Sequence, residues 1–215
     1  MKKNCQELFW RGRFGKKYTK RNYKQNLTSR FNLFSNIFNR ISKIKNVYEI
    51  GTNIGQNLDA IRKISRNITT HGIEINKIAY DVARKKHNVE LGSIFNSKEK
   101  KKFDFVLTRG LLIHINPKKL DQIYKIIHNL SKKYILIDEY FSPKPESCIR
   151  YRGYKDVLFK RDFAKELMQK YNLELIDYGF TWKEDANMKP LDSSNWFLFK
   201  KKKLLKKFTN FYLKY

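Results

Sequence analysis

Cysteine is nearly absent from this sequence, and long apolar runs do not occur in it. The only two cysteines, Cys5 and Cys148, form no C-x-x-C motif and no Cys/His cluster. This argues against a disulfide framework and a structural zinc site, so we predict no metal and a reducing compartment. No apolar run approaches the roughly 20 residues that a membrane span needs. Lys2 and Lys3 are not followed by the apolar segment of a signal peptide, and we therefore expect a cytoplasmic protein without a membrane span.

Acidic residues are also scarce. The chain has 20 acidic and 47 basic residues and a net charge of +27. Because the lysines are spread along the chain, we favour a basic surface that serves solubility or an anionic small substrate. Binding of RNA, anionic lipid or another polyanion stays the alternative. The basic and aromatic tail at 202–215 could contact a membrane surface or a polyanion, or be a solvated chain end.

The N-terminal part of the chain differs from the rest. No repeat or linker divides the 215 residues, which suggests one domain. Residues 7–22 are rich in aromatic and basic side chains but lack clear periodicity. We divide the chain into a lid and helix at 1–45, a main domain at 46–201 and the tail at 202–215. The helix is predicted from apolar residues at helical spacing, which are Leu27, Phe31, Phe34, Phe38 and Ile41.

Strand-like and helix-like stretches alternate along the main domain. Helices are expected between the strands, near 58–64, 78–83 and 117–130, and a further helix near 163–171. This alternation predicts an α/β fold with a doubly wound, mostly parallel sheet and an antiparallel edge strand. The predicted strands lie near 47–51, 68–75, 89–94, 103–108, 134–138, 173–178 and 196–200.

The stretch V-Y-E-I-G-T-N-I-G-Q-N at 47–57 carries the clearest functional signal. It predicts a strand, a tight loop with Gly51 and Gly55, and a helix start, an arrangement that holds a nucleotide-like cofactor. The spacing is neither the G-x-G-x-x-G of dinucleotide sites nor a phosphate-binding loop. Glu49 would repel a pyrophosphate but attract the ammonium or sulfonium side of S-adenosylmethionine (SAM). The loop therefore favours SAM over NAD.

Polar residues stand at the predicted carboxyl ends of most strands, where open parallel sheets bind ligands. Glu74 follows the glycine loop by about 20 residues, where an acid can bind both ribose hydroxyls. An acid at a strand end can also be solvated or cap a helix, but the glycines upstream favour the ribose role. The other strand ends carry Gly92, Ser93, Thr108, Arg109, Gly110, Asp138, Glu139 and Tyr140.

Further stretches give the chain a family resemblance. They are F-W-R-G-R-F-G-K-K-Y-T-K-R-N at 9–22, G-I-E-I-N at 72–76, L-T-R-G-L-L-I-H-I-N-P at 107–117, Y-I-L-I-D-E-Y at 134–140, Y-R-G-Y at 151–154, L-F-K-R-D-F-A at 158–164 and D-Y-G-F at 177–180. With the glycine loop, they resemble the class I SAM-dependent methyltransferases and, within these, the methylases associated with pseudaminic acid biosynthesis. The resemblance runs from about residue 7 to residue 201.

The resemblance implies a seven-stranded sheet and a set of cofactor contacts. It places Ser93 near the adenine. Asn53 stands where most methyltransferases have glycine, and asparagine tolerates left-handed backbone better than other non-glycine residues. The expected cofactor-binding residues are Glu49, Gly51, Asn53, Gly55, Asn57, Glu74, Ile75, Ser93 and Thr108.

Two residues are candidates for a general base. The methyl of a sulfonium is already activated, and alignment alone supplies about 7–11 kcal/mol in favourable cases. A base would still help a hydroxyl acceptor by about 10²–10⁴-fold. His114, just beyond the fourth strand, is our first candidate, and a packed histidine is its alternative. Glu139 at the end of the fifth strand is the second.

The acceptor is expected beyond the fifth strand. Arg150, Tyr151 and Arg152 follow it, and with Tyr140 they are our predicted acceptor-binding residues. Two arginines could clamp a carboxylate or phosphate, and a solvated basic loop is the alternative.

The aromatic segment before residue 23 is interpreted in two ways. It could form a lid over the cofactor or pack against the sheet, and both could hold. The residues concerned are Trp10, Phe14, Tyr18 and Arg21.

These observations lead to one main hypothesis and two alternatives. We expect a SAM-dependent methyltransferase whose acceptor is a sugar or sugar nucleotide of the nonulosonic or pseudaminic acid type in surface-glycan synthesis. The acceptor rests on the resemblance alone, because fold does not determine function. The alternatives are an RNA or protein methyltransferase and a non-catalytic polyanion-binding module on the same fold.

Overall fold

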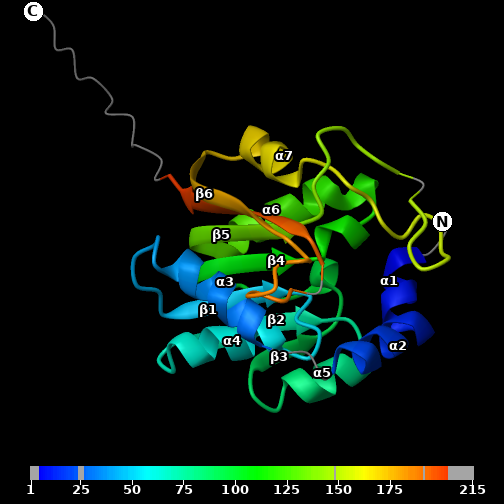
Figure 1. The fold of residues 1–215 in the computed structure, drawn as a ribbon, viewed down its shortest axis with the longest axis horizontal. Coiled ribbons are helices and arrows are strands. Elements are labelled where there is room, and N and C mark those ends of the chain that lie inside the picture. Colours follow the sequence, from blue (N-terminus) through cyan, green and yellow to red (C-terminus); the bar gives the residue numbers. More distant parts are fainter. Residues whose placement is uncertain (1–4, 24–26, 148, 191, 203–215) are drawn as a thin grey trace, which may run out of the picture.

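A seven-stranded sheet forms the centre of the protein (Figure 1). The computed structural model describes residues 5–23, 27–147, 149–190 and 192–202, so nearly all of the tail at 202–215 lies outside the described residues. The strand order is β3-β2-β1-β4-β5-β7-β6. The strands are β1 (Asn46–Ile50), β2 (Thr69–Glu74), β3 (Asn88–Leu91), β4 (Phe103–Arg109), β5 (Ser131–Glu139), β6 (Leu173–Thr181) and β7 (Ser194–Lys201).

The sheet is mixed, as predicted. Strands β1 to β5 are parallel to one another, whereas β7 is antiparallel to both β5 and β6. The antiparallel strand therefore lies between β5 and the outermost strand, β6. All carboxyl ends of β1 to β5 meet at one edge, which is where the polar strand-end residues gather.

Helices cover both faces of the sheet, which explains why its central strands are continuously apolar. On one face, Tyr48 and Ile50 of β1 belong to a core with α6 (Leu120–Leu130) and α7 (Phe163–Lys170). On the other face, Val47 packs in a second core with α3 (Thr28–Phe38) and α4 (Gln56–Ile64). Helix α5 (Lys77–Ala83) contacts β2 and β3.

Two helix starts follow from their sequences. The Asn76 side chain accepts hydrogen bonds from the backbone N–H groups of Ile78 and Ala79 at the start of α5. The Asn116 side chain accepts from Lys118 N, and Pro117 opens the 3-10 turn that precedes α6. Asparagine is favoured at such a position because its side-chain oxygen accepts from backbone N–H groups that have no partner within the helix. Proline is favoured in the first turn because its φ suits a helix and no N–H is needed there. The predicted helix start near Asn116 is confirmed.

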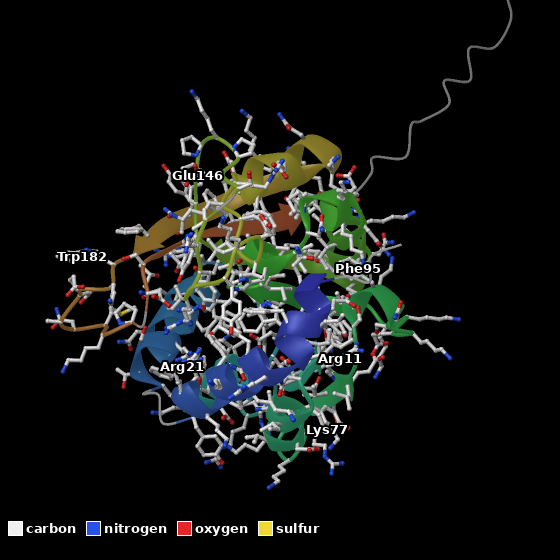
Figure 2. The ribbon with its side chains drawn as sticks, turned by 90° about the vertical axis from the view of Figure 1, so that its right-hand side faces the viewer. Arg11, Arg21, Lys77, Phe95, Glu146 and Trp182 are labelled. Carbon is white, nitrogen blue, oxygen red and sulfur yellow. The ribbon has the colours of Figure 1, made fainter. Side chains whose placement is uncertain are left out.

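The N-terminal helical extension begins earlier in the chain than the sequence predicts. Helix α1 (Cys5–Arg11) and helix α2 (Arg13–Asn22) lie across the side where the parallel strands end (Figures 1 and 2). Their aromatic side chains stack on one another: the ring centroids of Phe9 and Phe14 are 4.0 Å apart. Helix α2 is amphipathic, with Phe14 and Thr19 buried and its basic residues exposed, but its pattern consists of aromatic and basic residues and not of aliphatic ones. We call α1 and α2 the lid.

Two further features of the described residues bear on function. Within them, no helix is both long and apolar enough to cross a membrane. In the same part of the chain, no group of three or more His, Cys, Asp or Glu side chains is arranged to hold a metal ion.

Candidate cofactor and acceptor site

The loop between β1 and α4 has an unusual backbone. Three alternate residues, Gly51, Asn53 and Gly55, have φ angles of +80°, +49° and +85°. A Cβ on Gly51 would lie 2.9 Å from Leu111 Cδ1, and one on Gly55 would lie 2.7 Å from the His87 ring. Glycine is therefore required at both positions by conformation and by space, and asparagine adopts the left-handed conformation as expected.

A cavity of about 310 Å³ lies between this loop and the lid. Small-molecule sites start at roughly this size. Strand ends of β1, β2, β4 and β5 bound it on one side, and we call these strand ends and the loop of residues 51–57 the floor. Six predicted cofactor residues line the cavity: Gly51, Asn53, Asn57, Glu74, Ile75 and Ser93. Three do not line it: Glu49, Gly55 and Thr108.

Glu74 is held at the cavity wall by backbone groups. One carboxylate oxygen accepts a hydrogen bond of 2.7 Å from Asn53 N, and the other accepts one of 2.7 Å from Asn76 N. The side chain is buried, and this burial raises the pKa of Glu74, although the two N–H groups oppose the rise. Its orientation is therefore set by the loop that follows β1 and the turn that follows β2.

A buried polar network continues the floor on the α3 side of the sheet. Asn57 Nδ2 donates to Glu49 Oε1 at 2.6 Å, so Glu49 supports a lining residue from below. The Asn57 oxygen accepts from Arg30 Nε at 3.0 Å and from Arg109 Nη1 at 3.2 Å. Arg109 also donates to Asp138 at 2.7 Å. Two cations and one carboxylate thus contact the Asn57 amide, and a second carboxylate, that of Asp138, pairs with Arg109.

Burial shifts the pKa values of two groups in this network, Glu49 and Arg30. Burial raises the pKa of Glu49 to about 8, against the lowering effects of the Asn57 hydrogen bond and of Arg30. Burial, together with the charge of Arg109, lowers the pKa of Arg30 to about 10. Glu49 Oε2 and Asp138 Oδ1 are buried and accept no hydrogen bond from any described residue. Unpaired buried acceptors of this kind are costly. Of these two residues only Asp138 lines the cavity, where a cationic ligand group would satisfy its free oxygen.

His114 has the tautomer that a base requires. Its Nδ1 lies 2.6 Å from Val157 O, and because a carbonyl only accepts, Nδ1 carries the proton and Nε2 the lone pair. Burial lowers the pKa of His114 to about 4, so the ring is neutral at pH 7. The ring lines the cavity and lies 4.5 Å from the Trp10 ring and 5.2 Å from the Tyr151 ring, centroid to centroid.

Glu139 holds the segment that presents His114. Its carboxylate accepts from the backbone N–H groups of Leu111, Leu112 and Ile113 at 3.1, 3.0 and 3.4 Å. These residues enter the 3-10 turn Leu112–His114. Burial raises the pKa of Glu139 to about 7, although the N–H groups lower it. The geometry suits a positioning role more directly than a proton transfer.

The predicted acceptor residues divide into two groups. Tyr140 and Tyr151 line the cavity, but Arg150 and Arg152 are exposed and lie outside its lining. Arg152 has a φ of +49° in the tight turn between Tyr151 and Tyr154, and its guanidinium carbon lies 5.9 Å from the centroid of the Tyr151 ring. In this structure neither of the two arginines is part of the cavity lining.

Other residues take the place of these two arginines. Arg30 and Arg109 line the cavity, as do Tyr18 and Asp192. Burial raises the pKa of Tyr18, with added contributions from Tyr151 and Asp192 nearby. The sequence already places Arg109 at a predicted strand end, although it assigns no ligand to this residue. Nothing in the sequence singles out Arg30, which lies in an amphipathic helix, or Asp192, which follows a loop.

The lid is bonded to the floor and the neighbouring loops. Ser93 Oγ donates to Glu7 Oε1 at 2.6 Å, and Asn76 Nδ2 donates to the Trp10 carbonyl at 2.9 Å. Gln56 Nε2 donates to the Asn22 carbonyl at 3.1 Å. The aromatic segment therefore both packs on itself and covers the cavity.

Comparison with known proteins adds evidence on the fold. No family model matches the sequence, and no curated protein sequence matches it significantly. Solved structures do match. The chain is similar to magnesium protoporphyrin IX methyltransferase from Synechocystis PCC 6803 with bound SAM, at 12% identity and a TM-score of 0.65 over 94% of this chain and 100% of that chain.

Two further structures bind the demethylated cofactor, S-adenosylhomocysteine (SAH). The plantazolicin methyltransferase in complex with SAH is 15% identical, with a TM-score of 0.60 over 92% of this chain and 94% of that chain. Coclaurine N-methyltransferase bound to N-methylheliamine and SAH is 9% identical, with a TM-score of 0.63 over 81% and 70%. At such identities the similarity concerns the fold, and the chain has the Rossmann-like methyltransferase fold with its seven-stranded mixed sheet.

Proposed function

We propose that this protein is a SAM-dependent methyltransferase that acts on a small hydroxylated acceptor. One observation carries the proposal: the left-handed loop from Gly51 to Gly55 and the backbone-held Glu74 face the same lid-covered cavity. Structures of the same fold contain SAM or SAH. A carboxylate fixed at the end of β2 suits the two hydroxyls of a ribose.

The charges of the floor fit this cofactor better than a dinucleotide. Asp138 lines the cavity and has an unpaired oxygen that suits the ammonium group of SAM, whereas a pyrophosphate would meet the carboxylates of Glu74 and Asp138. Glu49 lies below the lining and supports Asn57. Gly51, Asn53 and Asn57 would hold the methionine part, and Ile75 and Ser93 the adenine.

The chemistry requires alignment and one proton acceptor. When bound, SAM supplies a methyl group activated by its sulfonium. His114 Nε2 would accept the proton of the acceptor hydroxyl, because Nδ1 is committed to Val157 O. The low pKa of His114 keeps the ring unprotonated at neutral pH but makes it a weak base, so alignment supplies most of the acceleration. Glu139 keeps the His114 segment in place.

The acceptor proposed is a sugar or sugar nucleotide, of the nonulosonic or pseudaminic acid type. Aromatic rings and phenol groups at the lid end of the cavity, from Trp10, Tyr18, Tyr140 and Tyr151, suit a hydroxylated ring. Arg30 and Arg109 would serve a carboxylate. The fold by itself leaves the acceptor open, since its relatives are named for magnesium protoporphyrin IX, plantazolicin and coclaurine.

Calorimetry with SAH tests the cofactor proposal directly. We expect binding by the unaltered protein and a loss of about 10–100-fold in affinity for Glu74→Gln, because a charged hydrogen-bonding partner of the ribose is removed. The exposed Glu174→Gln on β6 is the matched control. A protein that binds no SAH would contradict the proposal. The RNA alternative predicts binding that weakens steeply with salt, which can be measured on the same sample.

A further inference from the structure

Helix α1 of the lid carries two buried polar atoms without partners. Gln6 Oε1 and Trp10 Nε1 form no hydrogen bond with any described residue. Gln6 is only 7% exposed, and its Nε2 is already engaged, donating to Asp156 O at 2.9 Å. Because the two residues are four apart in a helix, they share one face, and both line the cavity. The lid therefore presents one unused acceptor and one unused donor to whatever binds there.

The pair lies at the His114 end of the cavity. The Trp10 ring is 4.5 Å from the His114 ring, centroid to centroid. Gln6 is bonded to Asp156, and His114 is bonded to the next residue, Val157.

A neighbouring residue of the same helix has a different partner. Glu7 is bonded to Ser93, which is near the adenine in the proposed cofactor arrangement. Helix α1 thus contacts the proposed adenine region through Glu7 and the His114 region through Trp10. The unpaired atoms belong to the residues next to His114, the proposed proton acceptor.

The two atoms select for one kind of group. A hydroxyl both donates and accepts, so a hydroxylated ligand satisfies the Trp10 N–H and the Gln6 carbonyl together. A carboxylate or phosphate only accepts and would leave Gln6 Oε1 unpaired. An ammonium only donates and would leave Trp10 Nε1 unpaired. Buried groups left unpaired weaken binding, so both kinds of ion are disfavoured at this position.

We propose that Gln6 and Trp10 form a hydroxyl-binding subsite for the methyl acceptor, so that the lid itself selects a polyhydroxylated substrate. This inference rests on the proposed methyltransferase function and deepens it. Gln6 and Trp10 are specificity-determining residues in this scheme, and His114 receives the proton. The adenine ring, which also presents donors and acceptors, is the competing occupant of the pair.

The indole N–H of Trp10 provides a direct readout. The chain has three tryptophans, so its ¹H–¹⁵N spectrum contains few indole signals, and Trp10→Phe assigns the relevant one while keeping an aromatic ring. The SAH-saturated protein would be titrated with N-acetylneuraminic acid, N-acetylglucosamine and UDP-N-acetylglucosamine. Sodium acetate and methylammonium chloride serve as the ionic probes without hydroxyls. Gln6→Leu removes the acceptor, and Gln122→Leu on the exposed side of α6 is its matched control.

We expect the Trp10 signal to shift saturably with at least one hydroxylated probe and with neither ionic probe. Gln6→Leu should raise the dissociation constant of that probe about tenfold, the scale of one buried hydrogen bond, and leave SAH affinity unchanged. The inference is overturned if no hydroxylated probe shifts the signal. It is also overturned if SAH itself shifts the signal and Gln6→Leu weakens SAH binding, since the pair would then serve the adenine. Failure of the proposed function has a separate signature, which is absence of SAH binding to the unaltered protein.

Discussion

The floor and the lid of the cavity are built in different ways. In the floor, the carboxylates of Glu74 and Glu139 are each held by two or three backbone N–H groups. In the lid, Gln6 and Trp10 have buried polar atoms without partners in the described part of the chain. A backbone-held group is preorganised and costs little to use in binding. The floor is thus suited to the constant part of the reaction, and the lid to recognition of a particular acceptor.

The floor and the lid also differ in how they are attached to the rest of the protein. The floor is attached to the central strands of the sheet. The apolar side chains of these strands are buried in the two cores, one on each face of the sheet. The lid is bonded to the floor and nearby loops through a few side-chain hydrogen bonds, such as those from Ser93 to Glu7 and from Gln56 to Asn22. Regions with few buried contacts open at lower free-energy cost. We therefore expect the lid to open for ligand exchange more readily than the sheet unfolds.

The largest expected effect concerns His114, which contacts both regions. His114→Asn should lower methyl transfer by about 10²–10⁴-fold, because the proton acceptor is lost, and should leave SAH affinity nearly unchanged. Turnover would be measured with an acceptor that the unaltered protein methylates. His128→Asn on α6 is the control, since this histidine stacks on Tyr171 outside the cavity. Near-normal turnover of His114→Asn would remove this residue from the mechanism.

The next prediction tests whether strain in the floor loop weakens cofactor binding more than similar strain elsewhere in the backbone. Gly51→Val should weaken SAH binding by about 100-fold, because the side chain is strained at a φ of +80° and clashes with Leu111. Gly153→Val is the matched control: its φ is +87°, but no atom lies within 4 Å of a Cβ added there. Calorimetry on both variants checks the comparison. Equal losses would mean that the conformation of the floor loop has no special role.

A smaller effect concerns the burial of Glu49 in the floor. Burial raises the pKa of Glu49 to about 8, so between its ordinary value and pH 8 the folded protein holds a proton that the unfolded chain has lost. Stability should therefore fall as pH rises through this window, by about 1 kcal/mol between pH 7 and 8. Glu139, whose pKa burial raises to about 7, adds a smaller fall in the same direction, whereas His114, whose pKa is about 4, does not titrate between pH 7 and 8.

Urea unfolding at pH 7 and pH 8 measures this loss. Glu49→Gln keeps the size of the side chain and removes its titration, so its stability should change less between the two pH values. A dependence that is the same in Glu49→Gln would show that another group titrates.

The smallest expected effect tests the attachment of the lid. Glu7→Gln weakens the hydrogen bond from Ser93 Oγ, which is 2.6 Å long, because a neutral oxygen replaces a carboxylate. We expect SAH to dissociate about 2–5-fold faster, since less energy holds the lid closed. Stopped-flow displacement of SAH would measure this rate. Glu184→Gln, at an exposed position after β6, is the control, and an unchanged rate in Glu7→Gln would contradict a closing role for this bond.

The sequence alone determined the sheet and the floor loop. Buried parallel strands are continuously apolar, so β4 and β5 could be predicted from local pattern. Gly51 and Gly55 are needed for left-handed backbone and close packing, which is a local requirement that glycine reveals. Because strand ends of a parallel sheet share one edge, Glu74 could also be predicted to lie near the loop.

Only the tertiary structure decided the lid and the acceptor end. Helices α1 and α2 place aromatic rings against the cavity, and the amphipathic pattern of α2 consists of aromatic and basic residues, which is harder to recognise in a sequence than an aliphatic pattern. Arg30 and Arg109, and not Arg150 and Arg152, line the cavity, because orientation across helix faces and turns depends on packing between distant segments. The hydrogen-bond partner of the Gln6 amide nitrogen, Asp156, lies 150 residues away in the chain, a separation that no local pattern records.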